Sequence, residues 1–176
     1  MTVNEIKKRA FDSIPDQVFS ENYSMIEAFL ENAIQTVETY CGRSFGVKTY
    51  KQYVEVEDWE RFGDKYRLIP AITPIVSSDL TYGKDFLLSD EPLEEIEYTA
   101  GFVNNPPDIE HLIYLLTIYE INRSLGNTYN FSVKTVVTGS STTNINEARE
   151  DFYREELMRL DKYKSKSYYS AVIEVE

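Results

Sequence analysis

The chain is 176 residues long, which suits one domain of ordinary size with an appended arm. Its 30 acidic and 18 basic residues give a formal net charge of −12, which argues against a basic nucleic-acid binder because DNA affinity comes largely from neutralising phosphates. One Cys and one His exclude an intramolecular disulfide and leave one candidate for any His-based site. No apolar run reaches the roughly 18 residues of a membrane span. We expect a soluble protein made in the cytoplasm.

Two helices are predicted in the first part of the chain. A stripe of apolar residues favours a short helix over 3–14, which Pro15 interrupts. Over 26–41, apolar or small residues recur three and four positions apart, which is typical of an amphipathic helix. Gly42 follows directly and is expected to end this second helix.

Residues 47–102 contain aromatic and β-branched residues in short alternating runs, which favour strands. Strands are expected at 50–56, 66–69, 75–82, 85–88 and 95–100. Gly83 and Lys84, between two of these runs, predict a hairpin turn. Together the runs predict a small, mostly antiparallel sheet.

A long helix is predicted after this segment. Pro107 suits the first helical turn, and Asp108 suits the positive end of the helix dipole. Apolar residues then cover most of the helix circumference over 107–125, with Gly126 and Asn127 expected as the stop. A helix that is apolar on so many sides must be covered on several of them. We therefore expect this helix at the centre of the domain.

The C-terminal part is expected to serve assembly. Residues 129–139 favour β-structure, and 140–144 are expected to form a polar linker. Asn146 can cap an amphipathic helix that begins near Glu147 and has only a narrow apolar face. The β-prone segment and this helix each have too little apolar surface to fold alone. We therefore expect both to pack against a neighbouring molecule. The expected protein-interface residues are Tyr129, Phe131, Val133, Val136, Val137, Phe152, Leu157, Leu160 and Tyr163.

Catalytic and ligand-binding chemistry has few candidates. His111 would need an orienting carboxylate and a nucleophile, and no local motif supplies them, so we expect a structural role. Cys41 reads as a small core residue. The acidic run over 90–97 lacks the spacing of a calcium loop, and the glycines form no phosphate-binding loop. We expect no catalytic residues, no cofactor and no metal.

Three segments together resemble a known family. They are Tyr40-Cys41-Gly42-Arg43-Ser44-Phe45 after a helix, Leu68-Ile69-Pro70 with Pro74-Ile75-Val76, and Glu97-Tyr98-Thr99-Ala100-Gly101-Phe102 followed by Pro106-Pro107-Asp108-Ile109 and a helix to Arg123. In this order and spacing they resemble the head–tail connector (adaptor, or head-completion) proteins of long-tailed bacteriophages. The resemblance covers about residues 20–125.

The resemblance implies a non-enzymatic structural protein of the virion, located at the head–tail interface. Such proteins form a homo-oligomeric ring, typically a dodecamer, beneath the portal protein. The ring extends the DNA channel and is the docking platform for the next connector (stopper) or tail protein. Double-stranded DNA passes through without specific binding, which a strongly acidic chain favours if its carboxylates face the channel.

The implied fold is α+β and predominantly helical. It consists of a small helical bundle with a β-rich insertion at about 47–102, followed by a C-terminal arm plus helix. We therefore expect a connector-like core domain over 1–126 and an assembly region over 127–176. Two alternatives stay open: a small acidic bacterial or phage adaptor or inhibitor that binds one protein partner through its C-terminal helix, and an enzyme that uses Glu or Asp with His111.

Overall fold

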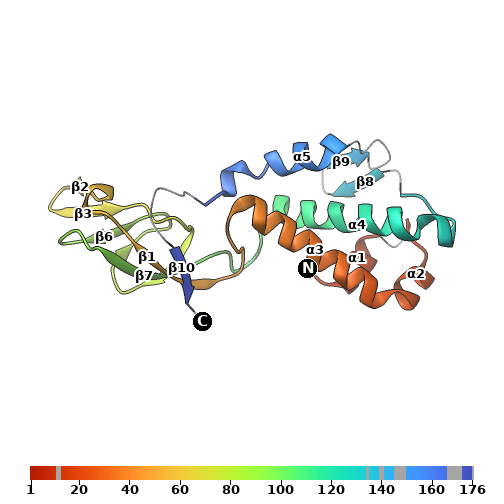
Figure 1. Ribbon diagram of the computed structural model, residues 1–176, viewed down its shortest axis with the longest axis horizontal. Coiled ribbons are helices and arrows are strands. Elements are labelled where there is room, and N and C mark those ends of the chain that lie inside the picture. Colours follow the sequence, from red (N-terminus) through yellow and green to blue (C-terminus); the bar gives the residue numbers. More distant parts are fainter. Residues whose placement is uncertain (11–12, 134, 139–140, 145–149, 166–171, 176) are drawn as a thin grey trace. The chain divides into compact units, whose positions relative to one another are not determined.

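A computed structural model describes residues 1–10, 13–133, 135–138, 141–144, 150–165 and 172–175. The chain divides into two compact units. One comprises 1–41 and 106–162 and contains the helices; the other comprises 42–105 and 163–176 and contains most of the strands (Figure 1). The β-rich unit thus interrupts the helical one in sequence. The expected division at residue 126 concerns roles in assembly and stays a prediction.

The helical unit is built from five α-helices in the described residues. They are α1 (Val3–Arg9), α2 (Asp16–Glu21), α3 (Tyr23–Cys41), α4 (Pro107–Tyr129) and α5 (Glu150–Met158). A capping box starts α1, because the Thr2 hydroxyl accepts from the Glu5 N–H while the Glu5 carboxylate accepts from the Thr2 N–H. The predicted helix over 26–41 is confirmed, and it ends at Gly42 in the left-handed conformation, with φ +64°.

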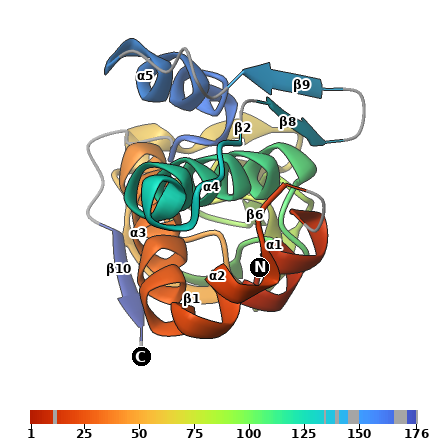
Figure 2. The same ribbon diagram turned by 90° about the vertical axis from the view of Figure 1, so that its right-hand side faces the viewer.

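Helix α4 lies at the centre of the helical unit. Figure 2 views it end-on, with α1, α3 and α5 arranged around it. The helix continues to Tyr129, four residues beyond the predicted end at residue 125, and is followed by Asn130, which is left-handed with φ 52°. Gly126 is buried inside the helix, where a Cβ atom would lie 2.9 Å from the Phe131 carbonyl oxygen. This glycine therefore permits close packing and does not end the helix.

The β-rich unit contains two four-stranded antiparallel sheets. Their strands are β1 (Lys48–Tyr53), β2 (Glu60–Phe62), β3 (Lys65–Leu68), β4 (Ile75–Ser78), β5 (Thr81–Tyr82), β6 (Leu87–Ser89), β7 (Glu95–Ala100) and β10 (Val172–Val175). One sheet has the strand order β10-β1-β7-β4 and the other β2-β3-β6-β5. The expected hairpin around Gly83 and Lys84 is the β5–β6 pair, closed by the Gly83 N–H donating to the Phe86 carbonyl.

The two sheets share one apolar core. Every second residue of β7 faces it, including Ile96 and Tyr98, as period-two alternation requires. The Tyr98 hydroxyl donates to Gln52 Oε1 at 3.0 Å and accepts from the Ile72 N–H at 3.3 Å. Burial raises the pKa of Tyr98 to about 12. The only Trp of the chain, Trp59, is buried in the same core.

Several expectations for fold are corrected. The chain is mixed helix and strand, and the description "predominantly helical" is wrong, because strands build nearly all of one unit. The expected polar linker over 140–144 contains strand β9 (Ser141–Asn144), which pairs with β8 (Thr135–Thr138). The expected first helix over 3–14 ends at Arg9. Strand β10, which carries no predicted element, completes the first sheet.

Candidate functional site

The segments that carry the family resemblance meet in an aromatic cluster within the β-rich unit. The guanidinium of Arg43 lies 5.4 Å from the ring centroid of Phe102 and 5.9 Å from that of Phe45. The Tyr163 ring packs edge-on against both phenylalanine rings. Arg43 Nη1 also donates to the Thr73 carbonyl, and the arginine is only 8% exposed. The buried Arg43 side chain thus links three segments that are distant in sequence, and Tyr163 adds a fourth through the two phenylalanine rings.

Glycines allow the backbone to close beneath this cluster. Gly101 has φ +132°, and a Cβ atom there would collide with the Gly46 carbonyl oxygen. The next residue, Phe102, donates its N–H to the Phe45 carbonyl at 2.9 Å. The resemblance-carrying residues Arg43, Phe45, Gly101 and Phe102 therefore organise the interior of the β-rich unit.

Three of the predicted interface residues take part in the chain's own packing. The Tyr129 hydroxyl accepts from Asn22 Nδ2 at 2.8 Å and donates to Glu21, which connects the end of α4 to α2. Val133 is buried, and its N–H donates to Asn122 Oδ1 at 2.9 Å. Leu160 is 1% exposed. A contact with a neighbour through Val133 or Leu160 would require this packing to open.

The other predicted interface residues fall into three groups. Phe131 and Leu157 are half-buried, and Tyr163 belongs to the aromatic cluster. Val136 and Val137 lie in β8 and Phe152 lies in α5, but their side chains are outside the described parts of the structure. An interface role for the whole set stays a prediction.

The segment that follows α5 is held to other helices of its unit. Lys162 Nζ lies 2.5 Å from Asp108 Oδ2 in the first turn of α4. The Tyr40 hydroxyl, at the end of α3, donates to Asp161 Oδ1 at 2.7 Å. Met158, at the end of α5, remains 48% exposed. The described part of α5 therefore keeps an exposed apolar side chain at its end, beside the half-buried Leu157.

The β-rich unit exposes apolar side chains that the sequence analysis did not single out. Phe62 on β2 and Ile173 on β10 are both 53% exposed, and Val175 is 40% exposed. The Arg67 guanidinium lies 5.0 Å from the Phe62 ring centroid. A signal for Phe62 was present, because an apolar residue directly before the turn residues Gly63 and Asp64 has little room to be buried. The β-branched residues of β10 favoured a strand, but nothing in the sequence marked them as exposed.

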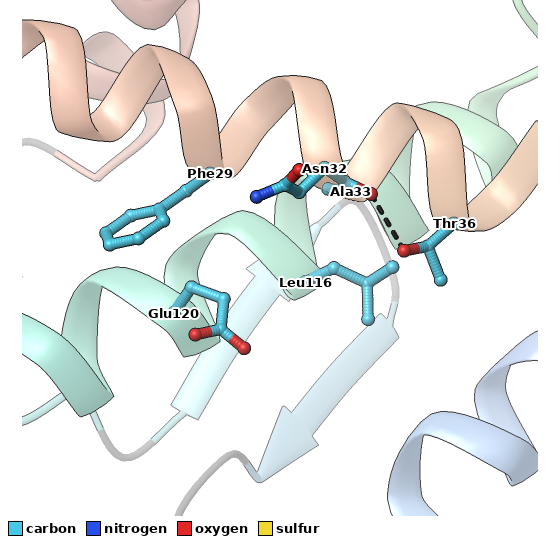
Figure 3. A pocket seen from close by; sticks show the side chains of 6 residues that line it. All are labelled: Phe29, Asn32, Ala33, Thr36, Leu116 and Glu120. Carbon is cyan, nitrogen blue, oxygen red and sulfur yellow. Dashed lines mark hydrogen bonds between the residues drawn. The ribbon is translucent and has the colours of Figure 1, made fainter.

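A groove of about 300 Å³ lies between α3 and α4 (Figure 3). Its wall from α3 consists of Phe29, Asn32, Ala33 and Thr36, and its wall from α4 consists of Leu116 and Glu120. The Thr36 hydroxyl donates to the Asn32 carbonyl at 2.7 Å, which occupies that donor within the helix. The groove offers a mixed surface of modest depth and no pair of groups arranged for catalysis.

A second hollow, of about 310 Å³, lies on the sheet β10-β1-β7-β4. It is lined by hydroxyl and carboxylate side chains together with Tyr98: Thr49, Ser77, Ser78, Asp79, Glu97, Tyr98 and Thr99. The Thr49 and Thr99 hydroxyls are 3.1 Å apart and hydrogen-bond to each other across the strands. The hollow is therefore a polar, acidic part of the sheet surface.

His111 is placed where protonation is unfavourable. Both ring nitrogens are buried, and neither has a hydrogen-bond partner among the described residues. Burial lowers the pKa of His111, and the nearby guanidiniums of Arg159 and Arg9 lower it further. A general base needs a group that orients it. No described carboxylate hydrogen-bonds to His111 to orient it in this way.

Two findings concern metals and membranes. In the part of the chain that the structure describes, no group of three or more His, Cys, Asp or Glu side chains is arranged to hold a metal ion. Among the described helices, none combines the length and apolar character needed to cross a bilayer.

Comparison with known proteins gives a likeness of fold. No protein-family model matches the sequence, and no curated protein matches it. Among solved structures, the fold is similar to that of a chain in the neck of an empty gene transfer agent (GTA) particle, computed with C6 symmetry. The identity is 13% and the TM-score is 0.51. The likeness covers 96% of this chain and 91% of the other, so it extends over both units.

Proposed function

We propose that this chain is a structural virion protein, a head–tail connector that forms a ring beneath the portal protein. The observation that carries the proposal is the likeness in fold to a neck component of a phage-like particle over nearly the whole of both chains. The sequence resemblance to phage connectors, found independently over about residues 20–125, supports the same role. Its motif residues Arg43, Phe45 and Phe102 form one buried cluster, as an ordered family motif should.

In this role the ring extends the DNA channel and presents a platform for the next connector or tail protein. Subunits of a closed ring meet through heterologous contacts, so each needs two different surfaces. Twelve copies of a chain with net charge −12 make a strongly acidic ring. Carboxylates that face the channel repel the phosphates of duplex DNA, which then passes without adhering. The role requires no catalytic residue, cofactor or metal.

Electron microscopy of the concentrated protein, alone and with the portal protein of the same phage, tests the proposal. We expect rings with rotational symmetry, and a collar on the portal. A protein that stays monomeric at high concentration and leaves the portal undecorated would contradict it.

A phage that lacks the whole protein separates the connector from a free-standing adaptor. If the protein is a connector, particles fail to assemble and the portal carries no collar. If it is an adaptor that binds one partner, particles assemble normally and only the activity of that partner changes. Removal of the whole protein is used because the C-terminal part is packed into both units, with Leu160 buried and β10 paired with β1.

A further inference from the structure

Among the described residues, one edge of the first sheet is unpaired and the other is covered by the protein's own chain. In the order β10-β1-β7-β4, the outer strands are β10 and β4. The outer side of β4 is covered by its own chain, because the Ile75 N–H donates to the Lys84 carbonyl at 2.7 Å and the Tyr82 hydroxyl donates to the Val76 carbonyl at 3.0 Å. No described strand pairs with the outer side of β10. Open edges are templates for another strand.

Strand β10 has the surface of a strand that receives a partner. Ile173 and Val175 face the same side of the sheet, opposite Lys51 and Thr49 of β1, and both are substantially exposed. Glu174 is neutralised by Lys48, whose Nζ lies 2.6 Å from Glu174 Oε1. The edge is therefore apolar on one face and locally balanced in charge within an acidic chain.

The hairpin β8–β9 is a strand pair without a sheet. Among the described strands, β8 and β9 pair only with each other. A two-stranded hairpin is marginally stable alone and gains stability when a third strand joins it. Strand β8 reads Thr-Val-Val-Thr, which suits a pleated surface, and no residue of 135–146 is charged. This stretch can approach another acidic copy without like-charge repulsion.

We propose that β8 of one copy adds to the open edge of β10 in the next copy. This inference rests on the proposed ring and names its subunit contact. The two surfaces are unlike, since one is a hairpin of the helical unit and the other an edge of the β-rich unit. The contact therefore repeats head to tail, which is the kind of contact that a closed ring requires. In the ring, β10 of each copy therefore adds a third strand to the hairpin of one neighbour, and β8 of the same copy pairs with β10 of the other neighbour.

Cross-linking between single-cysteine variants tests the contact. Cys41→Ala removes the native thiol, and Val137→Cys on β8 or Ile173→Cys on β10 is added singly or together. With a short bismaleimide, an equimolar mixture of the two single variants should give a cross-linked dimer, while each alone should not. The double variant should give a ladder of oligomers. Cross-linking of Ile173→Cys to itself indicates β10–β10 pairing and overturns the proposal.

A matched pair of substitutions gives the second test. Ile173→Glu and Phe62→Glu each charge a side chain that is 53% exposed and lies beside a cation of its own chain, Lys51 or Arg67. Both variants should remain folded by circular dichroism. Sedimentation should show at least tenfold weaker ring association for Ile173→Glu and less than twofold change for Phe62→Glu.

The outcomes separate the two proposals. The β8–β10 contact is overturned if the wild-type protein forms rings, Ile173→Glu and Phe62→Glu weaken ring association equally, and the mixed cross-link does not form. That result leaves the connector function intact. Absence of any ring or collar in the wild-type protein overturns both.

Discussion

Replacing Arg43 by Lys should destabilise the β-rich unit although the charge is kept. Lysine cannot present a planar group to Phe45 and Phe102 while its donor reaches the Thr73 carbonyl. A lost hydrogen bond from a buried charged group costs about 1.5–3 kcal/mol, and a desolvated cation–π contact contributes about 1–2 kcal/mol. Because lysine retains part of each, we expect a loss of about 3 kcal/mol in the free energy of unfolding of this unit.

Trp59 makes the measurement specific. It is the only Trp of the chain, it is buried in the core of the β-rich unit, and its indole N–H donates to the Leu93 carbonyl at 3.0 Å. Its fluorescence therefore follows unfolding of that unit in urea, while circular dichroism at 222 nm follows mainly the helices. With a urea dependence of about 2 kcal/mol per molar, Arg43→Lys should lower the fluorescence midpoint by about 1.5 M.

Arg67→Lys is the matched control. Arg67 also lies over an aromatic ring, that of Phe62, and it pairs with Glu60, but its side chain is 32% exposed. Exposed pairs of this kind contribute about 0.2–1 kcal/mol, so its midpoint should move by less than about 0.5 M. Equal shifts for the two variants would refute the reasoning that burial of the Arg43 cluster holds this unit together.

Three further predictions concern ionisation and charge. Because the pKa of Tyr98 is raised to about 12, the neutral phenol stabilises the fold fully below pH 10, and this stabilisation is lost as pH rises through 12. Absorbance at 295 nm should show one phenol that titrates at higher pH than the others, and Tyr98→Phe should remove it. Because the pKa of His111 is lowered in the folded protein, the neutral imidazole stabilises the fold above pH 6.5, and this stabilisation is lost as pH falls through the pKa of the folded protein. The urea midpoints at pH 7.5 and pH 5 should therefore differ less in His111→Leu than in wild type. Raising NaCl from 0.05 to 0.5 M should promote ring formation in sedimentation, because like charges are screened beyond the roughly 10 Å Debye length at 0.1 M; weaker association in high salt would show that attractive charge pairs dominate.

Local patterns predicted the elements whose boundaries have local causes. The end of α3 follows from the periodicity to Cys41 and the glycine after it. The end of α4 did not follow, because Gly126 serves a close approach to Phe131 that depends on the fold of the following loop. Strand β10 is four residues long and becomes a strand by pairing with β1, more than a hundred residues away in sequence. Its β-branched residues Val172, Ile173 and Val175 favour a strand, but so short a run does not by itself identify the strand with which it pairs.

The candidate surfaces show a related limit. An apolar residue such as Leu160 reads the same whether it is buried in its own chain or on a neighbour, because both environments remove it from water. Phe45 and Phe102 belong to the sequence motifs. The contacts that Arg43 and Tyr163 make with both rings depend on tertiary structure and could not be predicted from the sequence. The exposure of Ile173 on β10 could be recognised only once the sheet pairing was known.

The interruption of the helical unit has a consequence for synthesis on the ribosome. Helix α3 emerges first, but its partner α4 is separated from it by the whole segment 42–105. Three strands of the first sheet and all of the second are therefore complete while α3 still lacks α4. Strand β10 emerges after both helices, more than a hundred residues after its partner β1. Translation thus delivers this outer strand of the first sheet only after the other three strands and both helices are available to receive it.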